Sequence, residues 1–538
     1  MKELSSFFPE IHQIPDEFNL SNTVIKDKIL LNGEMVSFTG DYENVISPVM
    51  IKSNGNYENK LIGYAPLMNS EQALDALKSA KAAYNRGQGV WPTMKIENRI
   101  EHIEKFLAKF ISIRAVTVNL LMWEIGKSFE DSCKEFDRTV EYIKDTIEAL
   151  KVLDRQSSRF EIKDSIFAQI RRAPLGVVLC MGPFNYPINE TFTLMIPALI
   201  MGNVVIFKPP KHGVLLYKAI LESFAETLPP GVVNSVAGNG PTVISPLLQS
   251  GDIDVLAFIG SSKVGNILKK QHPKPNRLRC VLGLDAKNPA IILPDADIDL
   301  AVQEVLTGSL TFNGQRCTAL KIIFVHNAIE KEFNQKLANA ISNLKIGMPW
   351  EKGVKITPLP EKDKSNFLNS VLEDAKSKGS KVLNENGGTY FGSLYYPALI
   401  SPVSQDAELF NIEQFGPLVP VHPFEDMLEP VEHLINSPFG QQVSLFSSDP
   451  GKLSEMIDFL VNQYCRVNIN SQCQRGPDTF PFSGRKDSAE GTLSVSDALR
   501  VFSIRTLVAA KYNDLNKKIV TEITHNRSSN FLSTDFIL

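Results

Sequence analysis

The chain has 538 residues, too many for one ordinary hydrophobic core, so its length predicts two or three lobes. Apolar residues make up 43% of the chain, and 56 basic against 60 acidic side chains leave a formal charge of −4. This near-balance gives no electrostatic reason to expect nucleic acid as a partner. Six cysteines without any C-x-x-C pair predict reduced thiols, no metal site and a cytoplasmic protein.

No stretch of the sequence is typical of export or of membrane insertion. The first eighteen residues carry acidic side chains and prolines where a secretory signal needs a basic start and an apolar core. The most apolar long stretch, Leu175 to Phe207, contains three prolines together with Asn189 and Glu190, which a membrane span would not tolerate. We therefore expect no membrane partner.

Apolar residues recur at helical spacing from Ile96 to Leu153, which predicts a long helical region. After it, short apolar runs bounded by Gly, Pro or polar turns alternate with helical segments. This alternation predicts a parallel, doubly wound α/β sheet. The expected strands are Val177 to Leu179, Val204 to Phe207, Val233 to Val236 and Val255 to Ile259.

A second alternating set follows and predicts a second α/β lobe. Its expected strands are Ala290 to Leu293, Ile322 to Val325 and Val443 to Phe446, with helices at about Leu300 to Leu310 and Glu330 to Leu344. The last thirty or so residues are polar, so we expect a loosely held tail.

The most informative segment is Phe312 to Thr318, FNGQRCT, which lies between a predicted helix and a predicted strand. A nucleophilic cysteine needs such an exposed loop, and nearby N–H groups and the charge of Arg316 would lower the pKa of the Cys317 thiol. Taken alone, a cysteine in a loop is most often inert, so other motifs must support this interpretation.

Three further motifs follow predicted strands. Asn185, in PFNYP, offers an amide donor for a developing oxyanion, although a turn asparagine between two prolines is the more ordinary interpretation. Lys208, in KPPK, and the segment Gly260 to Gly265, GSSKVG, stand at the carboxyl ends of strands, where doubly wound sheets bind nucleotides. The glycine-rich segment also opens a helix whose N–H groups suit a pyrophosphate. Neither segment is a G-x-G-x-x-G fingerprint.

Together and in this order, the four motifs resemble the aldehyde dehydrogenase superfamily over about Leu30 to Ala510. The resemblance implies two doubly wound α/β domains, a Rossmann-like cofactor domain and a catalytic domain, with a small β oligomerisation segment. It implies that Cys317 is the nucleophile and that Asn185 holds the oxyanion. The cofactor-binding residues that it implies are Lys208, Gly260, Ser261 and Gly265, with Glu413 and Phe415 of EQFGP at the nicotinamide ribose.

The residue three positions after Lys208 bears on cofactor choice. NAD-preferring members of the superfamily have a glutamate there, and this chain has Lys211. A cation attracts the 2′-phosphate of NADP, which a carboxylate would repel. We predict NADP as the cofactor, with NAD as the alternative, and a solvated surface lysine is the other interpretation of Lys211.

Within the superfamily, the sequence is most similar to the non-phosphorylating glyceraldehyde-3-phosphate dehydrogenases, whose phosphate pocket uses arginines and a tyrosine. The matching positions are Arg138, Tyr186, Arg316 and Arg475. Arginine binds phosphate through charge-assisted, often bidentate hydrogen bonds. For each arginine taken separately, a structural salt bridge is as good an explanation. The resemblance predicts oxidation of a small phosphorylated aldehyde, glyceraldehyde 3-phosphate, to 3-phosphoglycerate through a thioester on Cys317.

One catalytic position departs from the superfamily. Its general-base glutamate, thirty-four residues before the nucleophile, is Gly283 here. Hydride transfer should survive, whereas hydrolysis of the acyl-enzyme loses a base that is typically worth about 10² to 10⁴ in rate. Asp285 is a tentative substitute, because residues two apart on a strand face the same side. Alternatively, coenzyme A accepts the acyl group, or the chain binds NADP and turns over poorly. The phosphate-site matches favour the first interpretation.

The expected domain organisation follows from the resemblance. We predict a cofactor domain from residues 1–156 and 173–284 and a catalytic domain from 285–490. Residues 157–172 and 491–538 would form the oligomerisation and bridging segments with the tail. The β-prone residues in 157–172 suit an oligomerisation hairpin, with an ordinary surface hairpin as the alternative. Members of this superfamily are usually dimers or tetramers, so we expect a homodimer or a homotetramer.

Overall fold

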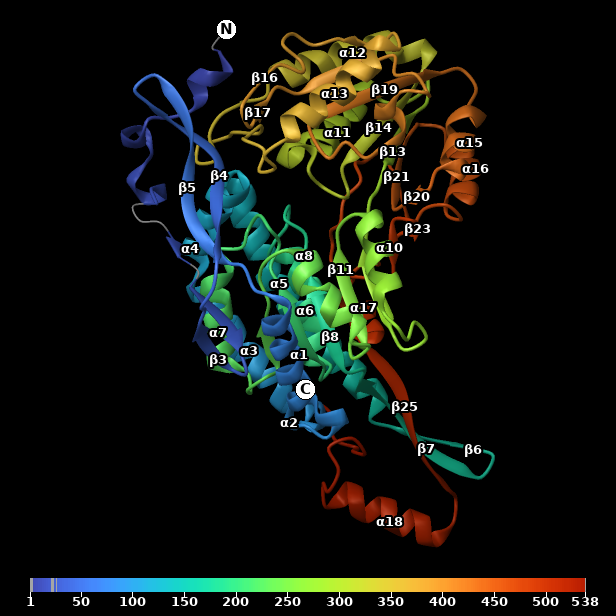
Figure 1. The fold of residues 1–538 in the computed structure, drawn as a ribbon. Helices are drawn as coiled ribbons and strands as arrows, with labels where there is room; N and C mark the ends of the chain where they lie inside the picture. Colours follow the sequence, from blue (N-terminus) through green and yellow to red (C-terminus); the bar gives the residue numbers. More distant parts are fainter. Residues whose placement is uncertain (1–2, 21–23, 26, 538) are drawn as a thin grey trace.

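The computed structural model describes residues 3–20, 24–25 and 27–537. Two α/β lobes, each built on a mainly parallel sheet, lie one above the other in Figure 1, and a β arm projects from the lower lobe. A long antiparallel ribbon, β4 (Tyr42–Ser53) and β5 (Asn56–Pro66), runs along the side of both lobes. The predicted fold class is therefore confirmed.

The lower lobe contains a parallel sheet with a topological switch point. Its strands are β8 (Val177–Met181), β9 (Val204–Lys208), β10 (Val233–Ser235), β11 (Val255–Ile259) and β12 (Arg279–Gly283). They lie in the order β10-β9-β8-β11-β12, with the short antiparallel β24 (Ala489–Glu490) at the edge. The four predicted strands of this lobe are confirmed. They are continuous apolar runs because helices cover both faces of a parallel sheet. The order reverses between β8 and β11, where such sheets open a crevice for nucleotides.

Helices surround this sheet on both sides. They include α1 (Ser70–Tyr84), α6 (Asn189–Ile200), α7 (Tyr217–Thr227), α8 (Gly240–Val243), α9 (Ser245–Gln249) and α10 (Ser262–Gln271). The region predicted as helical from Ile96 to Leu153 is three helices, α3 (Ile96–Ser112), α4 (Arg114–Ile125) and α5 (Phe129–Ser157). Gly126 ends α4 with φ of 69°, and the Ser128 hydroxyl accepts the Asp131 N–H at the start of α5. Within residues 3–20, 24–25 and 27–537, no single helix meets the length and apolarity needed to cross a membrane, whereas α3 and α4, bent by 66°, do so only as a pair.

The upper lobe contains the second sheet. Its strand order is β15-β18-β19-β14-β13-β21-β22, and only the edge strand β15 runs antiparallel. The strands are β13 (Asn288–Ile292), β14 (Leu320–His326), β15 (Lys381–Val382), β18 (Ala398–Ser401), β19 (Leu418–Phe424), β21 (Gln442–Phe446) and β22 (Arg466–Ile469). The covering helices include α11 (Ile298–Leu310), α12 (Asn327–Ser342), α13 (Lys364–Ser377), α15 (Leu428–Asn436) and α16 (Pro450–Leu460). The predicted strands and helices of this lobe are confirmed to within a few residues at their ends.

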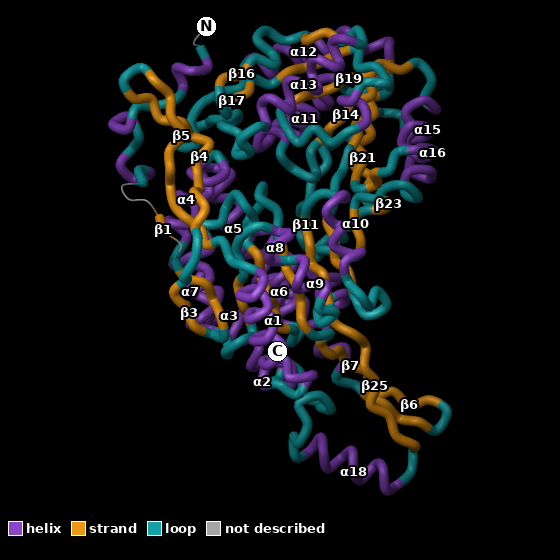
Figure 2. Tube along the Cα trace, viewed as in Figure 1, coloured by secondary structure: helices purple, strands orange, loops and turns teal. Residues whose placement is uncertain are grey.

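The projecting arm is an antiparallel sheet of β6 (Phe160–Lys163), β7 (Ile166–Pro174) and β25 (Ser503–Lys511), followed by α18 (Asp514–His525) (Figure 2). The loosely held tail predicted from the sequence is wrong. Leu532 is buried, and the Ser533 carbonyl accepts hydrogen bonds from the Gln169 and Arg171 side chains. The polar tail is thus held by hydrogen bonds to polar side chains of β7.

The domain boundaries stay a prediction. Two elements that the prediction assigned to other segments contact the lower lobe. β24, placed in the catalytic domain by sequence, pairs with β12 of the lower sheet. The helix α17 (Val495–Val501), placed in the oligomerisation segment, packs on α5 and α6. The chain thus returns to the lower lobe before it enters β25.

Candidate active site

Cys317 lies on the loop between the short helix η5 (Thr311–Gly314) and β14, just before the first residue of that strand. Two non-glycine residues before it, Phe312 and Asn313, have φ of 49° and 56°, a left-handed conformation that is costly for such residues. The Asn313 side chain holds this turn by bonding both ways with Thr357, through Nδ2 to its carbonyl at 3.0 Å and from its N–H at 3.0 Å. The nucleophile loop is therefore fixed in an unusual conformation.

The Cys317 carbonyl is held from two sides. It accepts hydrogen bonds from Asn288 Nδ2 at 2.8 Å and from Lys321 Nζ at 2.9 Å. The thiol itself is half-buried. Burial, reinforced by the negative charge of Glu190, raises the pKa of the Cys317 thiol to about 11, against the opposing charges of Lys321 and Arg475. At neutral pH the thiol is therefore protonated until a proton acceptor reaches it.

The sequence prediction that Arg316 lowers the pKa of this thiol is wrong. The Arg316 guanidinium turns to the last turns of α11, where Nη2 donates to the Gly308 carbonyl at 2.8 Å. Cations at a helix C-terminus are stabilised by the free carbonyls there. Arg316 therefore stabilises the fold of the loop and does not stabilise a thiolate at Cys317.

Asn185 reaches the nucleophile loop from the lower lobe. It is buried on the loop after β8, and its Nδ2 donates to the Gln315 carbonyl at 2.8 Å, two residues before Cys317. The second Nδ2 hydrogen makes no hydrogen bond to a described residue, nor does the Cys317 N–H. Both donors are thus free at the nucleophile loop, as an oxyanion site requires.

Lys127 is a buried residue that sequence reasoning missed. It lies between α4 and α5, pairs with Glu135, and donates from Nζ to the Asn185 carbonyl at 2.6 Å. Its ammonium group also lies 3.7 Å from the ring centroid of Tyr186 and 4.5 Å from that of Phe312. The available signal was a charged residue directly after Gly126, a glycine inside the region that was predicted to be helical. Lys127 thus touches both the oxyanion loop and the nucleophile loop.

The residues expected to hold the cofactor follow β9 and β11. Lys208 ends β9, and burial lowers its pKa. Ser261 caps α10, with its hydroxyl accepting the Val264 N–H. At Gly265 an added Cβ would lie 3.0 Å from the Leu284 side chain, so glycine lets α10 approach β12. Gly260 donates its N–H to the Gly283 carbonyl at 3.0 Å. These groups follow the carboxyl ends of β9 and β11, next to the switch point, where doubly wound sheets bind dinucleotides.

Glu413 and Phe415 approach the same crevice from the upper lobe. Glu413 Oε1 accepts from Lys321 Nζ at 2.6 Å and from the Ala286 N–H at 3.3 Å. The Phe415 ring lies edge-on to Phe184 with centroids 5.9 Å apart, so the loops of the two lobes meet there. Glu413 and Phe415 thus stand at the crevice, and their contact with the ribose stays a prediction.

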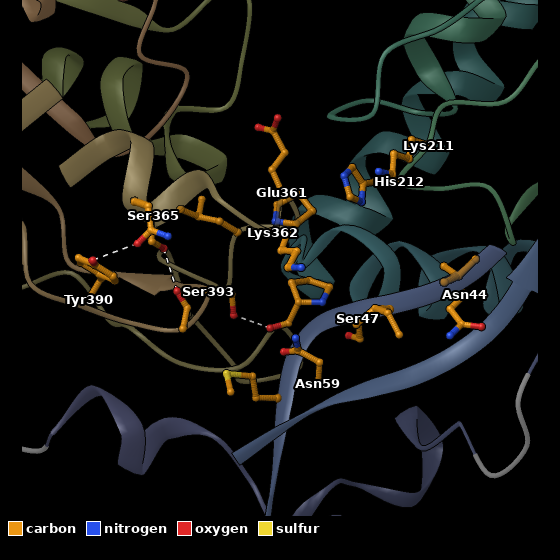
Figure 3. Close-up of a pocket in the computed structure, with 18 of the residues that line it drawn as sticks. Asn44, Ser47, Asn59, Lys211, His212, Glu361, Lys362, Ser365, Tyr390 and Ser393 are labelled. Atoms are coloured by element: carbon orange, nitrogen blue, oxygen red, sulfur yellow. Dashed lines mark hydrogen bonds between the residues drawn. The ribbon is translucent and has the colours of Figure 1, made fainter. Parts of the chain in front are cut away.

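Lys211 faces a cavity of about 580 Å³ between the β4–β5 ribbon and the upper lobe (Figure 3). His212, Lys362, Glu43 and Glu361 also line this cavity, and Cys317 does not. Lys211 is exposed and makes no ion pair within the part of the chain that the structure describes. Its ammonium is therefore free to bind an anion.

The tentative base Asp285 has a different partner. Its Oδ2 accepts hydrogen bonds from the Ser262 N–H at 2.8 Å and the Ser262 hydroxyl at 2.6 Å, at the N-terminus of α10. A carboxylate there is stabilised by the helix dipole. An added Cβ at Gly283 would lie 3.2 Å from Ile259 and 3.5 Å from Leu493. Asp285 is therefore a helix cap, and its role as the replacement for the missing glutamate stays a prediction.

The four residues predicted to bind phosphate lie near one another, but carboxylates already bind Arg138 and Arg475. Arg138 forms a bidentate pair with Asp478, with both N···O distances at 2.7 Å. Arg475 donates to Asp478 at 2.9 Å, to Glu190 at 2.5 Å and to the Leu493 carbonyl at 3.0 Å. Burial raises the pKa of the Tyr186 hydroxyl, and the nearby charges of Arg316 and Arg138 oppose this rise.

Glu190 is the second residue that sequence reasoning missed. It stands in the first turn of α6, five residues after Asn185, and its carboxylate is almost entirely buried. Its charge is the largest electrostatic influence on the Cys317 thiol after burial itself. Sequence analysis used Glu190 only to exclude a membrane span, because a single charge in an apolar helix does not reveal its partner.

A doubly wound sheet whose loops meet a cysteine loop with a free amide donor is typical of an NAD(P)-dependent oxidoreductase with a thiol nucleophile. The sequence profile of the Aldehyde dehydrogenase family matches residues 47–507, and the chain belongs to this family. It is an NAD(P)-dependent aldehyde dehydrogenase.

Two similar proteins differ in their substrates. The chain is 33% identical over 460 residues to the NADP-dependent glyceraldehyde-3-phosphate dehydrogenase of Streptococcus equinus, covering 84% of this chain and 92% of that one. It is 28% identical over 470 residues to the lactaldehyde dehydrogenase of Methanococcus aeolicus, covering 85% and 97%.

Two solved structures differ in their cofactors. The Bacillus halodurans NADP-dependent glyceraldehyde-3-phosphate dehydrogenase complexed with NADP matches with a TM-score of 0.82 and 28% identity, over 90% of this chain and 99% of that one. The betaine aldehyde dehydrogenase of Staphylococcus aureus in complex with NAD⁺ has the same fold, with a TM-score of 0.82 and 24% identity over 91% and 95%. Proteins of this fold thus bind either dinucleotide.

Proposed function

We propose that this enzyme oxidises glyceraldehyde 3-phosphate to 3-phosphoglycerate with NADP, through a thioester on Cys317. The observation that carries the proposal is the convergence of Arg138, Tyr186 and Arg475 beside the thiol, from segments up to 337 residues apart in the sequence. Charge-assisted hydrogen bonds from arginine suit a phosphate. To bind it, Arg138 and Arg475 exchange part of their contacts with Asp478 for contacts with the substrate.

The chemistry begins at the sulfur. The Cys317 thiol loses its proton to solvent and its thiolate attacks the aldehyde carbon, while the Asn185 amide with the Cys317 N–H stabilises the oxyanion. A nicotinamide dinucleotide held by Lys208 and Ser261 would supply the hydride acceptor. Water then hydrolyses the thioester, so no acyl phosphate forms.

The preference for NADP rests on Lys211. Its ammonium is unpaired and faces open space next to the predicted ribose contact Lys208. A 2′-phosphate would find a cation there where a carboxylate would repel it. NAD, which lacks this phosphate, should bind more weakly.

We further propose a cytoplasmic homodimer or homotetramer that associates through the β arm. Apolar side chains on this arm are exposed in the single chain, at Ile162, Ile166, Ile504, Leu507 and Val508. Exposed apolar patches of this kind mark interaction surfaces. The cytoplasmic location rests on the scattered free cysteines.

One assay tests the substrate, the cofactor and the acyl acceptor. Purified protein is mixed with glyceraldehyde 3-phosphate or lactaldehyde, with NADP or NAD, and with or without coenzyme A. We expect the highest kcat/KM with glyceraldehyde 3-phosphate and NADP, and no activity in Cys317→Ser. Equal kcat/KM for the two aldehydes would contradict the phosphate site.

A second candidate function is acyl transfer to coenzyme A. The observation in its favour is that Gly283 lacks the usual base and that Asp285 is held at α10. Under this function, coenzyme A would raise the steady rate and acyl-coenzyme A would appear as product. A free acid formed at an unchanged rate excludes it.

A further inference from the structure

The step without an assigned residue is the attack of water on the acyl-enzyme. Gly283 has no side chain, and the Asp285 carboxylate is bound to Ser262. Two other carboxylates act on the Cys317 thiol, those of Glu190 and Glu413. The Glu413 carboxylate is held by Lys321 and lies on the cofactor side. Glu190 instead pairs with Arg475, one of the residues predicted to bind the substrate phosphate.

The position of Glu190 is set by the loop that carries the oxyanion donor. Its N–H donates to the Tyr186 carbonyl at 3.2 Å, so Glu190 lies one helical turn after the residue next to Asn185. The Tyr186 ring in turn packs against Phe312 of the nucleophile loop, with centroids 6.2 Å apart. The same turn of chain thus carries the Asn185 amide, which bonds the nucleophile loop, and the Glu190 carboxylate, whose charge acts on the Cys317 thiol.

The two oxygens of the Glu190 carboxylate have different surroundings. Oε2 is bound by Arg475 Nη1 at 2.5 Å, whereas Oε1 accepts no hydrogen bond from any residue between 27 and 537. In the free enzyme the other two nitrogens of Arg475 bind Asp478 and the Leu493 carbonyl, so three contacts hold its guanidinium in place. The ion pair therefore orients the carboxylate and leaves one oxygen able to accept a proton.

The same contacts connect Glu190 with the position of the missing base. Leu493 is the residue whose side chain lies 3.5 Å from where a Cβ at Gly283 would be. Its carbonyl binds Arg475, and Arg475 binds Glu190. Glu190 and Gly283 are thus connected through Leu493 and Arg475.

We propose that Glu190 is the general base that activates water for hydrolysis of the acyl-enzyme. The inference rests on the proposed thioester at Cys317. Glu190 Oε1 takes a proton from water as the water oxygen bonds to the thioester carbon. The carbon–sulfur bond then breaks, the carboxylic acid leaves, and the proton on Glu190 returns to the Cys317 sulfur. No electrons are transferred in this step, and every atom is accounted for.

Burial supports this role by its effect on the carboxylate. It raises the pKa of Glu190, while the charges of Arg475 and Arg138 oppose the rise and keep the group able to ionise. A base works best when its pKa lies near the working pH, and carboxylates in enzymes reach that range through burial.

The test compares hydride transfer with hydrolysis in Glu190→Gln, which keeps the shape and removes the base. We expect a burst of NADPH equal to the enzyme concentration, followed by turnover about 10² to 10⁴ times slower than in the wild type. Intact-protein mass spectrometry should show the acyl group on the protein during the slow phase. Hydroxylamine, which attacks thioesters without a base, should restore fast turnover.

A matched control removes a buried ion pair elsewhere. Asp154→Asn breaks the buried pair between Asp154 and Arg171 at the base of the β arm. Asp154→Asn should turn over like the wild type. Slow turnover after the burst would then be specific to Glu190→Gln. Glu190→Asp, which keeps the carboxylate, should retain more of the hydrolysis rate than Glu190→Gln and serves if Glu190→Gln does not fold.

The possible failures have different signatures. Glu190→Gln that turns over at the wild-type rate, or that loses the burst together with the slow phase, overturns the assignment of Glu190. Wild-type protein that forms no NADPH with any aldehyde contradicts the proposed function itself, independently of Glu190.

Discussion

At the scale of the residue, Cys317 depends on its surroundings more than on its motif. Burial and Glu190 raise the pKa of its thiol to about 11, above the usual value of about 8.5. Because only the thiolate reacts, alkylation by iodoacetamide should keep accelerating well above pH 8.5 in the free enzyme. The rate is measured by mass spectrometry on the peptide that contains Cys317. A plateau below pH 8 would mean that the thiol is activated at rest.

Lys211 provides a second prediction at this scale. Lys211→Glu replaces an unpaired cation with an anion beside the predicted 2′-phosphate site. A hydrogen bond to a charged group contributes about 1.5–3 kcal/mol, so the Kd for NADP should rise at least about tenfold. The Kd for NAD should change little. Fluorescence titration measures both, and Lys163→Glu on the exposed strand β6 is the control. Equal effects on the two cofactors would show that Lys211 does not contact the phosphate.

At the scale of the element, the C-terminal tail is the segment whose behaviour differs most from its composition. A chain that stops before Arg527 loses Leu532 and the Ser533 contacts to Gln169 and Arg171. Each buried polar group left without a partner costs about 1–3 kcal/mol, so the Tm should fall by several degrees. Differential scanning calorimetry measures this. Leu515→Ser changes a residue that is 68% exposed on α18 and should leave the Tm nearly unchanged. An unaltered Tm in the shortened chain would mean that the tail contacts add nothing.

The helix α10 binds Asp285, a residue that the sequence pattern indicated as a tentative catalytic base. Its first N–H groups need acceptors, and Asp285 follows the neighbouring strand β12 at the right height to supply one. The strand-face rule predicted that Asp285 points with Gly283. The rule fails because β12 ends at Gly283, so Asp285 is no longer part of a strand.

At the scale of the whole molecule, Lys127 joins the two lobes. It contacts Asn185 and Tyr186 in the lower lobe and Phe312 in the upper one, and its charge is balanced by Glu135. Lys127→Met leaves Glu135 buried without its partner, which typically costs about 3–5 kcal/mol. We expect that loss of unfolding free energy in urea titration, and a slower NADPH burst because the oxyanion loop loses its support.

The control for this prediction is an exposed lysine on α5, the helix that follows Lys127. Lys144→Met breaks only the surface pair with Glu141, which contributes about 0–1 kcal/mol. Lys127→Met with the stability of Lys144→Met would contradict a structural link between the lobes.

The sequence by itself determined the strands of both sheets, the fold class and the loop that carries Cys317. These features are local, because a strand buried on both faces must be a short apolar run and a nucleophile needs a loop between elements. It also placed Asn185 beside that loop through the order of its motifs.

Only the tertiary structure decided the partners of the charged residues. Glu190 and Arg475 meet across 285 positions of sequence, and Arg138 and Asp478 across 340. Lys127, Arg316 and the tail were misjudged or missed for the same reason. A charged side chain takes its role from whichever group faces it after folding, and the spacing of residues along the chain carries no information about that group.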